Sequence, residues 1–250
     1  MLPGRDPAVS NEVIAFTSHL DHVGIGEPVN GDKIYNGALD NAAGIAAMLE
    51  VARVLANQPQ KLRRSVLFIA VTAEEKGLIG SDYFASKPTV PRERLVGVIN
   101  LDGAMPFYQL VDVIGYGADS STLGASLKEA AASLGITVSP DLEPGQQFFT
   151  RSDHYPFVRR GIPGIFLIAG NAATPDGKNA RQINESWSQQ HLHRPSDDLN
   201  QPFDYGHMVQ WAELFRRWTE RAANADQRPL WYANDYFGKR FAPDARKVRR

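Results

Sequence analysis

The sequence predicts a three-layer α/β/α sandwich, in which helices cover both faces of a mostly parallel sheet. Two observations carry this prediction. Apolar segments of strand length alternate along the 250-residue chain with segments whose apolar residues recur at helical spacing. The strand segments are also apolar almost throughout, as at 65–72 and 95–101, and such strands are typical of sheets that are buried on both faces.

The expected regular elements follow one another along the chain. The predicted strands are 12–17, 65–72, 95–101, 110–115 and 163–169. The predicted helices are 45–55, 77–85, 121–134, 155–160 and 204–223. Asp40 or Asn41 is well placed to cap the first of these helices.

The remaining segments predict irregular structure. Residues 24–37 contain four glycines and predict a loop, and residues 170–190 predict a long polar loop. Residues from about 225 mix aromatic and charged side chains and predict an irregular C-terminal tail. Since the sequence contains neither a repeat nor a linker, we expect one domain over residues 1–250.

Composition excludes several classes of function. The 27 basic and 28 acidic residues give a formal net charge of -1, so nothing predicts a nucleic acid or an anionic membrane as partner. There is no cysteine, which excludes disulfides and thiolate zinc sites and leaves His, Asp and Glu as metal ligands. The chain has no signal-peptide pattern and no apolar run of membrane-spanning length, so its sequence identifies no compartment.

Two adjacent carboxylates, Glu74 and Glu75, follow the apolar segment 65–72 almost directly. Ligands of open α/β sheets collect at the carboxyl ends of the strands, where an acidic pair can hold a metal and move a proton. The same two residues would equally suit the first turn of a helix, because the helix dipole favours negative charge there. Taken alone, the pair does not decide between these interpretations.

Polar side chains also mark the ends of two other predicted strands. His19 and Asp21 follow the first strand, and Asp102 follows the third. Asp40 precedes a predicted helix, and His193 lies in a loop. Strand ends and helix starts of a parallel layer face the same edge, so these groups can converge. Imidazoles and carboxylates suit zinc and related divalent ions, and a carboxylate shared by two half-sites would build a two-metal site.

Six short motifs make the sequence similar to a known family. In chain order they are SHLDHVG (18–24), YNGALDNAAG (35–44), AEEKGLIGS (73–81), NLDG (100–103), RSDHYPF (151–157) and HRPSDD (193–198). The series resembles the M28 family of zinc aminopeptidases, whose members carry two zinc ions on a three-layer α/β sandwich. The resemblance extends from about His19 to Ala223, and six motifs in the family's order are a specific match.

The resemblance implies a ligand for each position of a two-zinc site. His19 and Asp102 would bind one zinc ion. Glu75 and His193 would bind the second ion, and Asp40 would bridge the two. The same ligands would also suit manganese or cobalt.

The resemblance also implies the catalytic residues. Glu74 would be the general base that accepts a proton from the activated water and delivers it to the leaving amine. Asp21 would be the carboxylate that orients the His19 imidazole. The implied reaction is the removal of N-terminal residues from peptides with a free N-terminus. We expect His22 to be a loop residue or an outer neighbour rather than a ligand.

Several other residues have weaker claims to the site. His191 competes with His193, because only one residue separates them. The family places its histidine directly before x-Pro-Ser-Asp, which favours His193. His154, Phe149 and Tyr155 are candidates for binding the substrate, and each would equally suit ordinary packing.

The chain departs from the family pattern at its start. Catalytic domains of the family ordinarily have further strands and a helix before the first ligand, whereas this chain reaches His19 almost at once. We expect the missing strands to leave an exposed sheet edge, which proteins normally cover or pair. This predicts a stability cost or self-association over that edge.

Two other functions stay open on the sequence. A glutaminyl-cyclase-like enzyme would use a related fold with one zinc ion, and a non-catalytic binding domain would keep the fold without the reaction. Asp40 and Asp102 complete a ligand set for two ions, which favours the peptidase over the first alternative. The presence of Glu74 beside that set favours it over the second.

Overall fold

A six-stranded sheet forms the centre of the computed structural model, which describes residues 1–250. In spatial order the strands are β4 (Ser65–Val71), β1 (Val13–His19), β5 (Leu95–Leu101), β8 (Gly164–Ala169), β6 (Asp112–Tyr116) and β7 (Thr137–Ser139). The first four strands are parallel to one another, and β6 runs antiparallel to β8. The predicted mostly parallel sheet is therefore confirmed.

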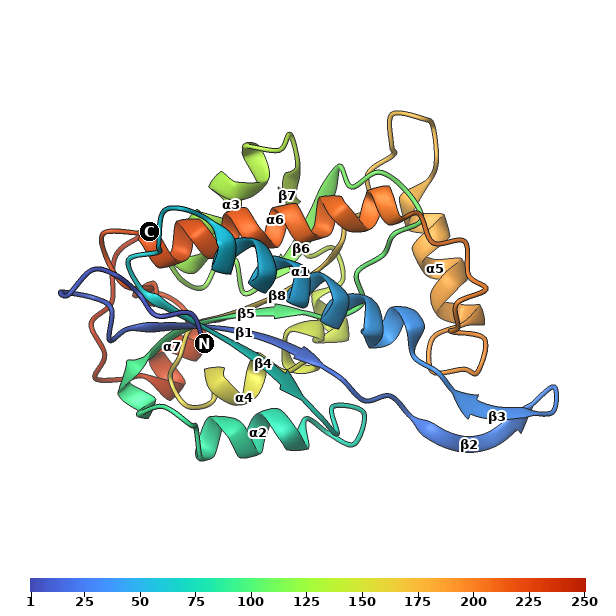
Figure 1. Ribbon diagram of the computed structural model, residues 1–250, viewed down its shortest axis with the longest axis horizontal. Helices are drawn as coiled ribbons and strands as arrows, with labels where there is room; N and C mark the ends of the chain where they lie inside the picture. The colour runs from blue at the N-terminus through green and yellow to red at the C-terminus, as the bar shows by residue number, and fades with distance from the viewer.

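Helices cover both faces of this sheet (Figure 1). One layer contains α1 (Gly44–Asn57), α3 (Leu123–Ala132) and α6 (Tyr205–Asn224), with α6 between the other two. The other layer contains α2 (Ile79–Ser86) and α4 (Tyr155–Val158), which contact each other. This arrangement confirms the three-layer sandwich. No helix combines the length and the apolar character needed to cross a bilayer.

Strand β1 shows why the sheet must be covered on both faces. All seven of its residues are buried. Ile14 and Phe16 belong to the larger core under α1 and α6, whereas Val13 and Ala15 belong to the smaller core under α2 and α4. The Phe16 ring stacks on that of Phe215 with 5.2 Å between ring centroids. Truncating such a buried aromatic ring to alanine costs about 3–5 kcal/mol.

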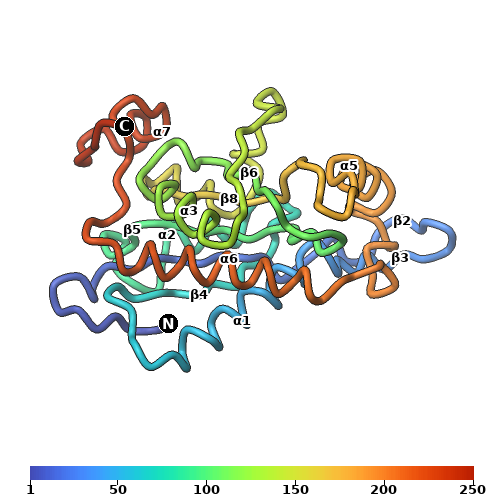
Figure 2. The backbone as a smooth tube through the Cα atoms, turned by 90° about the horizontal axis from the view of Figure 1, so that it is seen from above, coloured from blue at the N-terminus to red at the C-terminus, as the bar shows by residue number.

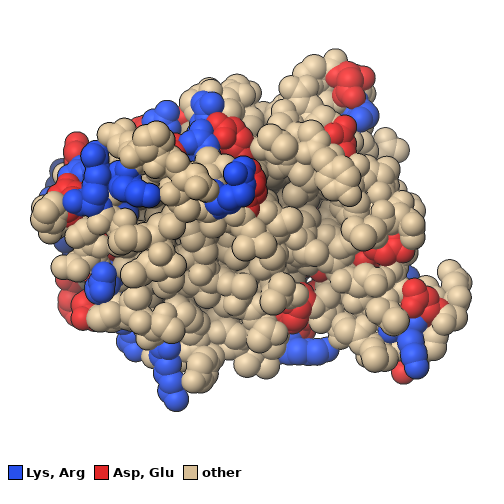
Figure 3. Space-filling view, in the orientation of Figure 1, with Lys and Arg blue, Asp and Glu red and all other residues tan.

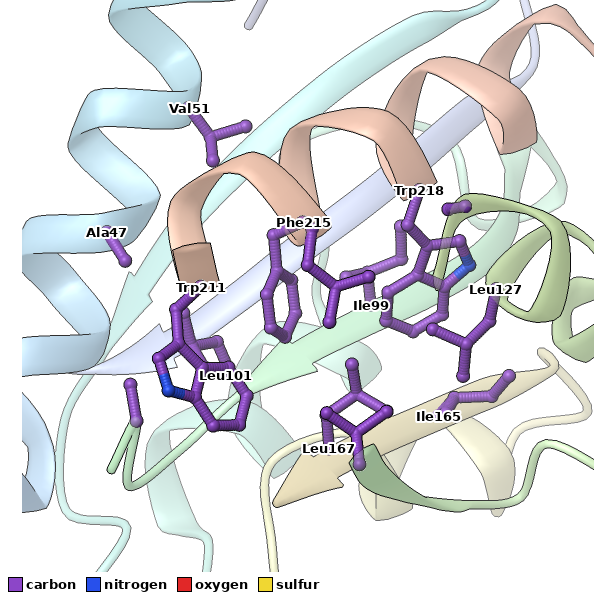
Figure 4. Packing of buried hydrophobic residues seen from close by; sticks show 14 of the residues in the cluster. Ala47, Val51, Ile99, Leu101, Leu127, Ile165, Leu167, Trp211, Phe215 and Trp218 are labelled. Carbon is purple, nitrogen blue, oxygen red and sulfur yellow. The ribbon is translucent and has the colours of Figure 1, made fainter. Parts of the chain in front are cut away.

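The larger core is organised by the aromatic face of α6 (Figure 4). Trp211, Phe215 and Trp218 point from this helix onto the sheet and are completely buried. Their partners on β5 and β8 are Ile99, Leu101, Ile165 and Leu167. The indole N–H groups are also satisfied, because Trp211 donates to Met105 O at 3.0 Å and Trp218 donates to Leu123 O at 3.3 Å.

The predicted loop over residues 24–37 is wrong for most of its length. Strands β2 (Gly24–Val29) and β3 (Asp32–Tyr35) form an exposed hairpin. Its turn contains Asn30 and Gly31 with φ angles of 52° and 86°, and Asn-Gly is the sequence preferred for a two-residue hairpin turn. The Asn-Gly pair therefore indicated a hairpin, although the many glycines of this segment favoured a loop.

The predicted loop over residues 170–190 is wrong in its second half, where α5 (Ala180–Gln190) forms. The side chain of Asn179 caps this helix by accepting the Gln182 N–H at 3.1 Å. Ala180, Ile183 and Trp187 lie at helical spacing and pack inward. Polar residues between them hid the pattern. Figure 2 shows α5 and the β2–β3 hairpin at one end of the molecule and the C-terminus at the other.

The C-terminal segment from residue 225 is irregular apart from the short helix α7 (Tyr236–Phe241). Trp231 anchors this segment, since it is only 2% exposed and donates its Nε1–H to Gly161 O at 2.8 Å. Residues of α7 pack beside Tyr155 and Val158 of α4. The tail therefore extends the layer formed by α2 and α4.

Strand β4 lies at one edge of the sheet, with part of that edge covered. Leu2 and Val66 exchange two backbone hydrogen bonds of 2.8 and 2.9 Å across an isolated bridge. The bridge covers the start of the strand and leaves the later residues without a strand neighbour on that side. Self-association over this edge stays a prediction.

Candidate metal centre

The carboxyl ends of three parallel strands bring the predicted site residues to one edge of the sheet. His19 is the last residue of β1 and pairs in register with Val71, the last residue of β4. A short turn then carries β4 to Glu74 and Glu75, and Asp102 directly follows β5. Fewer Lys and Arg side chains appear at this end than at the end where the strands begin (Figure 3).

The first half of the site is a buried contact between one imidazole and two carboxylates. His19 Nε2 lies 3.1 Å from Asp40 Oδ1 and 3.1 Å from Asp102 Oδ1. These three residues form a group in which one ligand atom from each lies within 4.8 Å of the others. The other ring nitrogen, Nδ1, lies 2.9 Å from the Asp21 backbone oxygen and 3.9 Å from the Asp21 carboxylate. The main chain of Asp21 therefore orients the ring in this structure.

The second half of the site uses the other oxygen of Asp40. His193 Nε2 lies 3.3 Å from Asp40 Oδ2 and 3.0 Å from Glu75 Oε2. His22 Nδ1 lies 2.8 Å from Glu75 Oε1, yet these two atoms are buried without a hydrogen bond. Buried polar atoms normally have partners, so facing lone-pair atoms without one are what a cation-binding group requires. His22, Asp40 and Glu75 form the second metal-sized group of the structure.

One buried amide holds together three segments that carry these residues. Asn41 Nδ2 donates to Ser18 Oγ at 3.0 Å and to Leu101 O at 3.1 Å. Its Oδ1 accepts the N–H groups of Gly44 at 3.1 Å and Gly103 at 3.2 Å. Three of these partners, Ser18, Leu101 and Gly103, adjoin His19 or Asp102 in the chain. A side chain at Gly44 would place its Cβ 2.0 Å from the Asn41 oxygen, so glycine is required there.

Asp197 fixes the main chain at the shared carboxylate. Its Oδ1 accepts the Leu39 N–H at 2.7 Å, and its Oδ2 accepts the Asp40 N–H at 3.0 Å. Burial raises the pKa of Asp197, and these two backbone bonds oppose that effect. Both oxygens of Asp197 are therefore occupied by the main chain on either side of the Leu39–Asp40 peptide.

A chain of buried hydrogen bonds supports the first half of the site from beneath. Thr17 donates to Asn100 Oδ1 at 2.7 Å, and Asn100 donates to Ser152 Oγ at 2.7 Å. Ser152 in turn donates to Asp102 Oδ2 at 2.7 Å. This leaves Oδ1 of Asp102 directed at His19, so the chain sets the orientation of the carboxylate.

The charges of the cluster shift one another strongly. Burial opposes ionisation of His19, but the Asp102 and Asp40 carboxylates outweigh it and raise the pKa of His19 to about 12. Burial works against ionised Asp40 too, yet contacts with His19 and His193 hold its pKa well below the usual range. Asp40 and Glu75 raise the pKa of His193 to about 10. Burial raises the pKa of Glu74 to about 9, and the nearby Asp102 carboxylate adds to this effect.

A cavity of about 620 Å³ opens over the cluster. Four of the carboxylates, Asp40, Glu74, Glu75 and Asp102, line one part of its wall together with His193. Apolar side chains line much of the rest, namely Leu39, Leu78, Met105, Phe148, Phe166, Ile168, Ala169, Trp187 and Leu192. A cavity with a few polar groups set against an apolar wall is the usual form of a small-ligand site.

The structure does not place the three predicted substrate-binding residues on this cavity. His154 is completely buried, with its ring stacked on Phe166. Phe149 packs against Phe237 of α7 at 4.4 Å between ring centroids, and Tyr155 belongs to the same aromatic cluster. The neighbour Phe148 lines the cavity instead.

The histidines are distinguished by their contacts. His193 reaches Asp40 and Glu75, whereas His191 Nδ1 contacts Ser196 Oγ at 2.9 Å. His22 Nδ1 contacts Glu75 Oε1, and its expected role as an outer neighbour rather than a ligand stays a prediction.

Comparison with known sequences identifies the family. Residues 1–219 match the sequence model of peptidase family M28. The chain belongs to this family. The leupeptin-inactivating enzyme 1 of Streptomyces exfoliatus is 32% identical over 184 residues, which cover 72% of this chain and 37% of that protein. The M28 chain therefore spans well under two thirds of this curated relative.

Solved structures show the same fold. BSAP, a zinc aminopeptidase from Bacillus subtilis, superposes with a TM-score of 0.65 at 25% identity, over 90% of this M28 chain and 50% of that one. The glutaminyl cyclase of Porphyromonas gingivalis superposes with a TM-score of 0.61 at 20% identity, over 84% of this chain and 73% of that one. The second likeness concerns the fold alone.

Proposed function

We propose that the protein is a dizinc aminopeptidase that removes N-terminal residues from peptides. The observation that carries this proposal is the position of Asp40. One oxygen of this carboxylate contacts His19 and the other contacts His193. A carboxylate that faces two imidazole–carboxylate groups in this way is the arrangement expected of a bridging ligand in a two-metal site.

The donor set fits zinc. His19 and Asp102 would hold one ion, and Glu75 and His193 would hold the other. Asp40 would be a ligand of both ions. All donors are imidazole nitrogens or carboxylate oxygens, which zinc accepts. The buried atoms of His22 and Glu75 that have no hydrogen-bond partner lie at the second position. BSAP, which shares the fold, is a zinc aminopeptidase.

Glu74 would be the general base. Two bound zinc ions would supply an acidified water and polarise the scissile carbonyl. Glu74 lines the cavity beside the ligands and makes no contact with an imidazole of either metal group. Its pKa of about 9 shows a high affinity for a proton, and bound cations nearby would bring this pKa down towards neutral pH. Glu74 would take a proton from the attacking water and pass it to the leaving amine.

Asp21 would support this chemistry through its main chain and its carboxylate. The backbone oxygen holds His19 Nδ1, which fixes the tautomer that directs Nε2 to the metal position. The carboxylate accepts the Glu74 N–H at 3.4 Å. Asp21 therefore connects the ligand imidazole to the segment that carries the base.

The cavity supports a peptide with a free N-terminus as substrate. Its carboxylates would attract the positive amino group, and the apolar wall opposite would receive the first side chain. A glutaminyl-cyclase-like enzyme with a single zinc ion would leave one of the two groups of ligands without a metal. A binding domain would not need a proton acceptor at Glu74.

The proposal is tested by zinc content and aminopeptidase activity measured together. Wild type, Glu74→Gln and the control Glu93→Gln, on an exposed residue at the far end of β5, would be assayed on aminoacyl-p-nitroanilides. We expect two zinc ions per chain in all three proteins. Activity should fall about 10²- to 10⁴-fold in Glu74→Gln alone. Full activity in Glu74→Gln would refute the role of Glu74 as general base. A wild-type protein that binds no zinc would refute the proposed zinc aminopeptidase function.

A further inference from the structure

Arg151 is the one residue around the cavity with a guanidinium side chain. It is the single lysine or arginine among the residues that line it, which include four carboxylates. The Arg151 side chain is exposed and forms no ion pair or hydrogen bond within the chain. A guanidinium group that lines the same cavity as four carboxylates and pairs with none of them has its donors free for a ligand.

Two of the carboxylates on the neighbouring surface are already paired. Glu143 and Glu185 both contact another arginine, Arg181, at 3.5 Å and 2.6 Å. Phe148 instead supports Arg151, whose Cζ lies 5.4 Å from the centroid of that ring. Stacking over an aromatic face holds a guanidinium and leaves its edge donors free.

The main chain fixes Arg151 next to the candidate metal centre. Its N–H donates to Phe148 O at 3.0 Å. The next residue is the buried Ser152, whose hydroxyl donates to Asp102 at 2.7 Å. Arg151 therefore directly precedes a residue that is hydrogen-bonded to a proposed zinc ligand. Its own side chain lines the cavity.

We propose that Arg151 binds a substrate carboxylate one residue beyond the scissile bond, an inference that rests on the proposed aminopeptidase function. In that reaction the amino group and the first side chain occupy the acidic and apolar walls, and the rest of the peptide leaves towards the cavity mouth. One extended residue spans about 3.3–3.6 Å. A carboxylate on the second residue thus stays close to the metal cluster, where the planar guanidinium can bind it through two parallel hydrogen bonds.

Two chemical sources can supply this carboxylate. One is the free C-terminus of a dipeptide, and the other is an Asp or Glu side chain at the second position of a longer peptide. The first source makes the enzyme a dipeptidase by preference, and the second makes it selective for acidic second residues. Both depend on the same guanidinium.

The test compares substrates that differ only in this charge. For the C-terminus the pair is Leu-Gly and Leu-Gly-amide, and for the side chain it is Leu-Asp-amide and Leu-Asn-amide. We expect wild type to prefer the charged member of at least one pair by about tenfold or more in kcat/KM, as for a charge-assisted hydrogen bond. The preferred pair identifies the source. Each ratio compares kcat/KM for two substrates on the same enzyme, so a loss of activity that affects both substrates equally does not change the ratio.

Arg151→Met should reduce the preference to about onefold, and Arg151→Lys should retain part of it, because lysine keeps the charge without the planar fork. The control is Arg92→Met, an exposed arginine at the opposite end of β5, which should keep the wild-type ratio. A wild-type ratio near one in both pairs, or an unchanged ratio in Arg151→Met, would overturn the inference. Leucyl-p-nitroanilide carries no carboxylate, so its hydrolysis by wild type tests the aminopeptidase function independently.

Discussion

The two halves of the candidate metal centre are built in different ways. In the first half, His19 ends a central strand with its side chain 1% exposed, and Asp102 directly follows another strand. In the second half, the His193 side chain is 51% exposed and its backbone has a φ angle of 53° in a loop between α5 and α6. Asp40 belongs to both halves.

The difference concerns how firmly each half is held. The hydrogen bonds that Ser152 donates to Asp102 and that His19 donates to the Asp21 backbone oxygen fix the first half on buried strands. The second half contains facing atoms of His22 and Glu75 that have no hydrogen-bond partner. We therefore expect the first half to bind its ion tightly in a preformed geometry. The second half depends on a loop and should bind its ion more weakly.

Removing one ligand from each half gives the largest contrast. Asp102→Asn should lower the affinity for the first ion, and with it activity, by about 10³-fold, since losing a mere supporting partner already costs 10- to 100-fold. His193→Gln should leave one ion per chain bound at the first half. Isothermal titration with zinc would measure both affinities. Equal losses from the two substitutions would contradict the difference between the halves.

Weakening the support beneath the first half should have a smaller effect. In Ser152→Ala, Asp102 loses a donor and Asn100 loses an acceptor. The affinity for the first ion should fall about tenfold, with a loss of about 1–3 kcal/mol in the free energy of unfolding. The control is Ser126→Ala on α3, whose hydroxyl bonds only to Leu123 O of its own helix. An unchanged zinc affinity would show that the chain of hydrogen bonds does not orient Asp102.

The smallest expected effect concerns His154, two residues after Ser152. Burial lowers its pKa from 6.5 to about 3, so the unfolded chain binds a proton that the folded chain excludes. The stability that depends on neutral His154 is complete above pH 6.5 and is lost as pH falls towards 3. Metal-free wild type should lose about 1 kcal/mol relative to His154→Phe between pH 6.5 and 5.5, because the unfolded histidine is already half protonated at pH 6.5. Urea denaturation would measure this, and parallel losses in both proteins would contradict it.

Much of the fold could be predicted because its sheet is central and parallel. Strands such as 95–101 are apolar almost throughout, and helices such as 204–223 show a clear aromatic face, so local pattern and tertiary packing agree. Helix α5 escaped prediction because only Ala180, Ile183 and Trp187 mark its inner face. The β2–β3 hairpin escaped because both of its strands are largely exposed.

The site could be predicted to the level of residue types and strand ends. The motifs predict that Asp40 lies between His19 and His193, and both histidines contact Asp40 in the structure. Supporting contacts could not be predicted, because they join residues far apart in sequence, as Asn41 does with Leu101 and Ser152 does with Asp102. The residues around the cavity depend on how loops pack, which is why Phe148 lines it and Phe149 does not.

The shared position of Asp40 is the central claim, and locating bound zinc tests it most directly. Crystals of the zinc-loaded protein would be measured by anomalous scattering above and below the zinc edge. We predict two peaks about 3.5–4 Å apart, with Asp40 between them, one beside His19 and the other beside His193. A single peak, or two peaks of which only one contacts Asp40, would contradict the account.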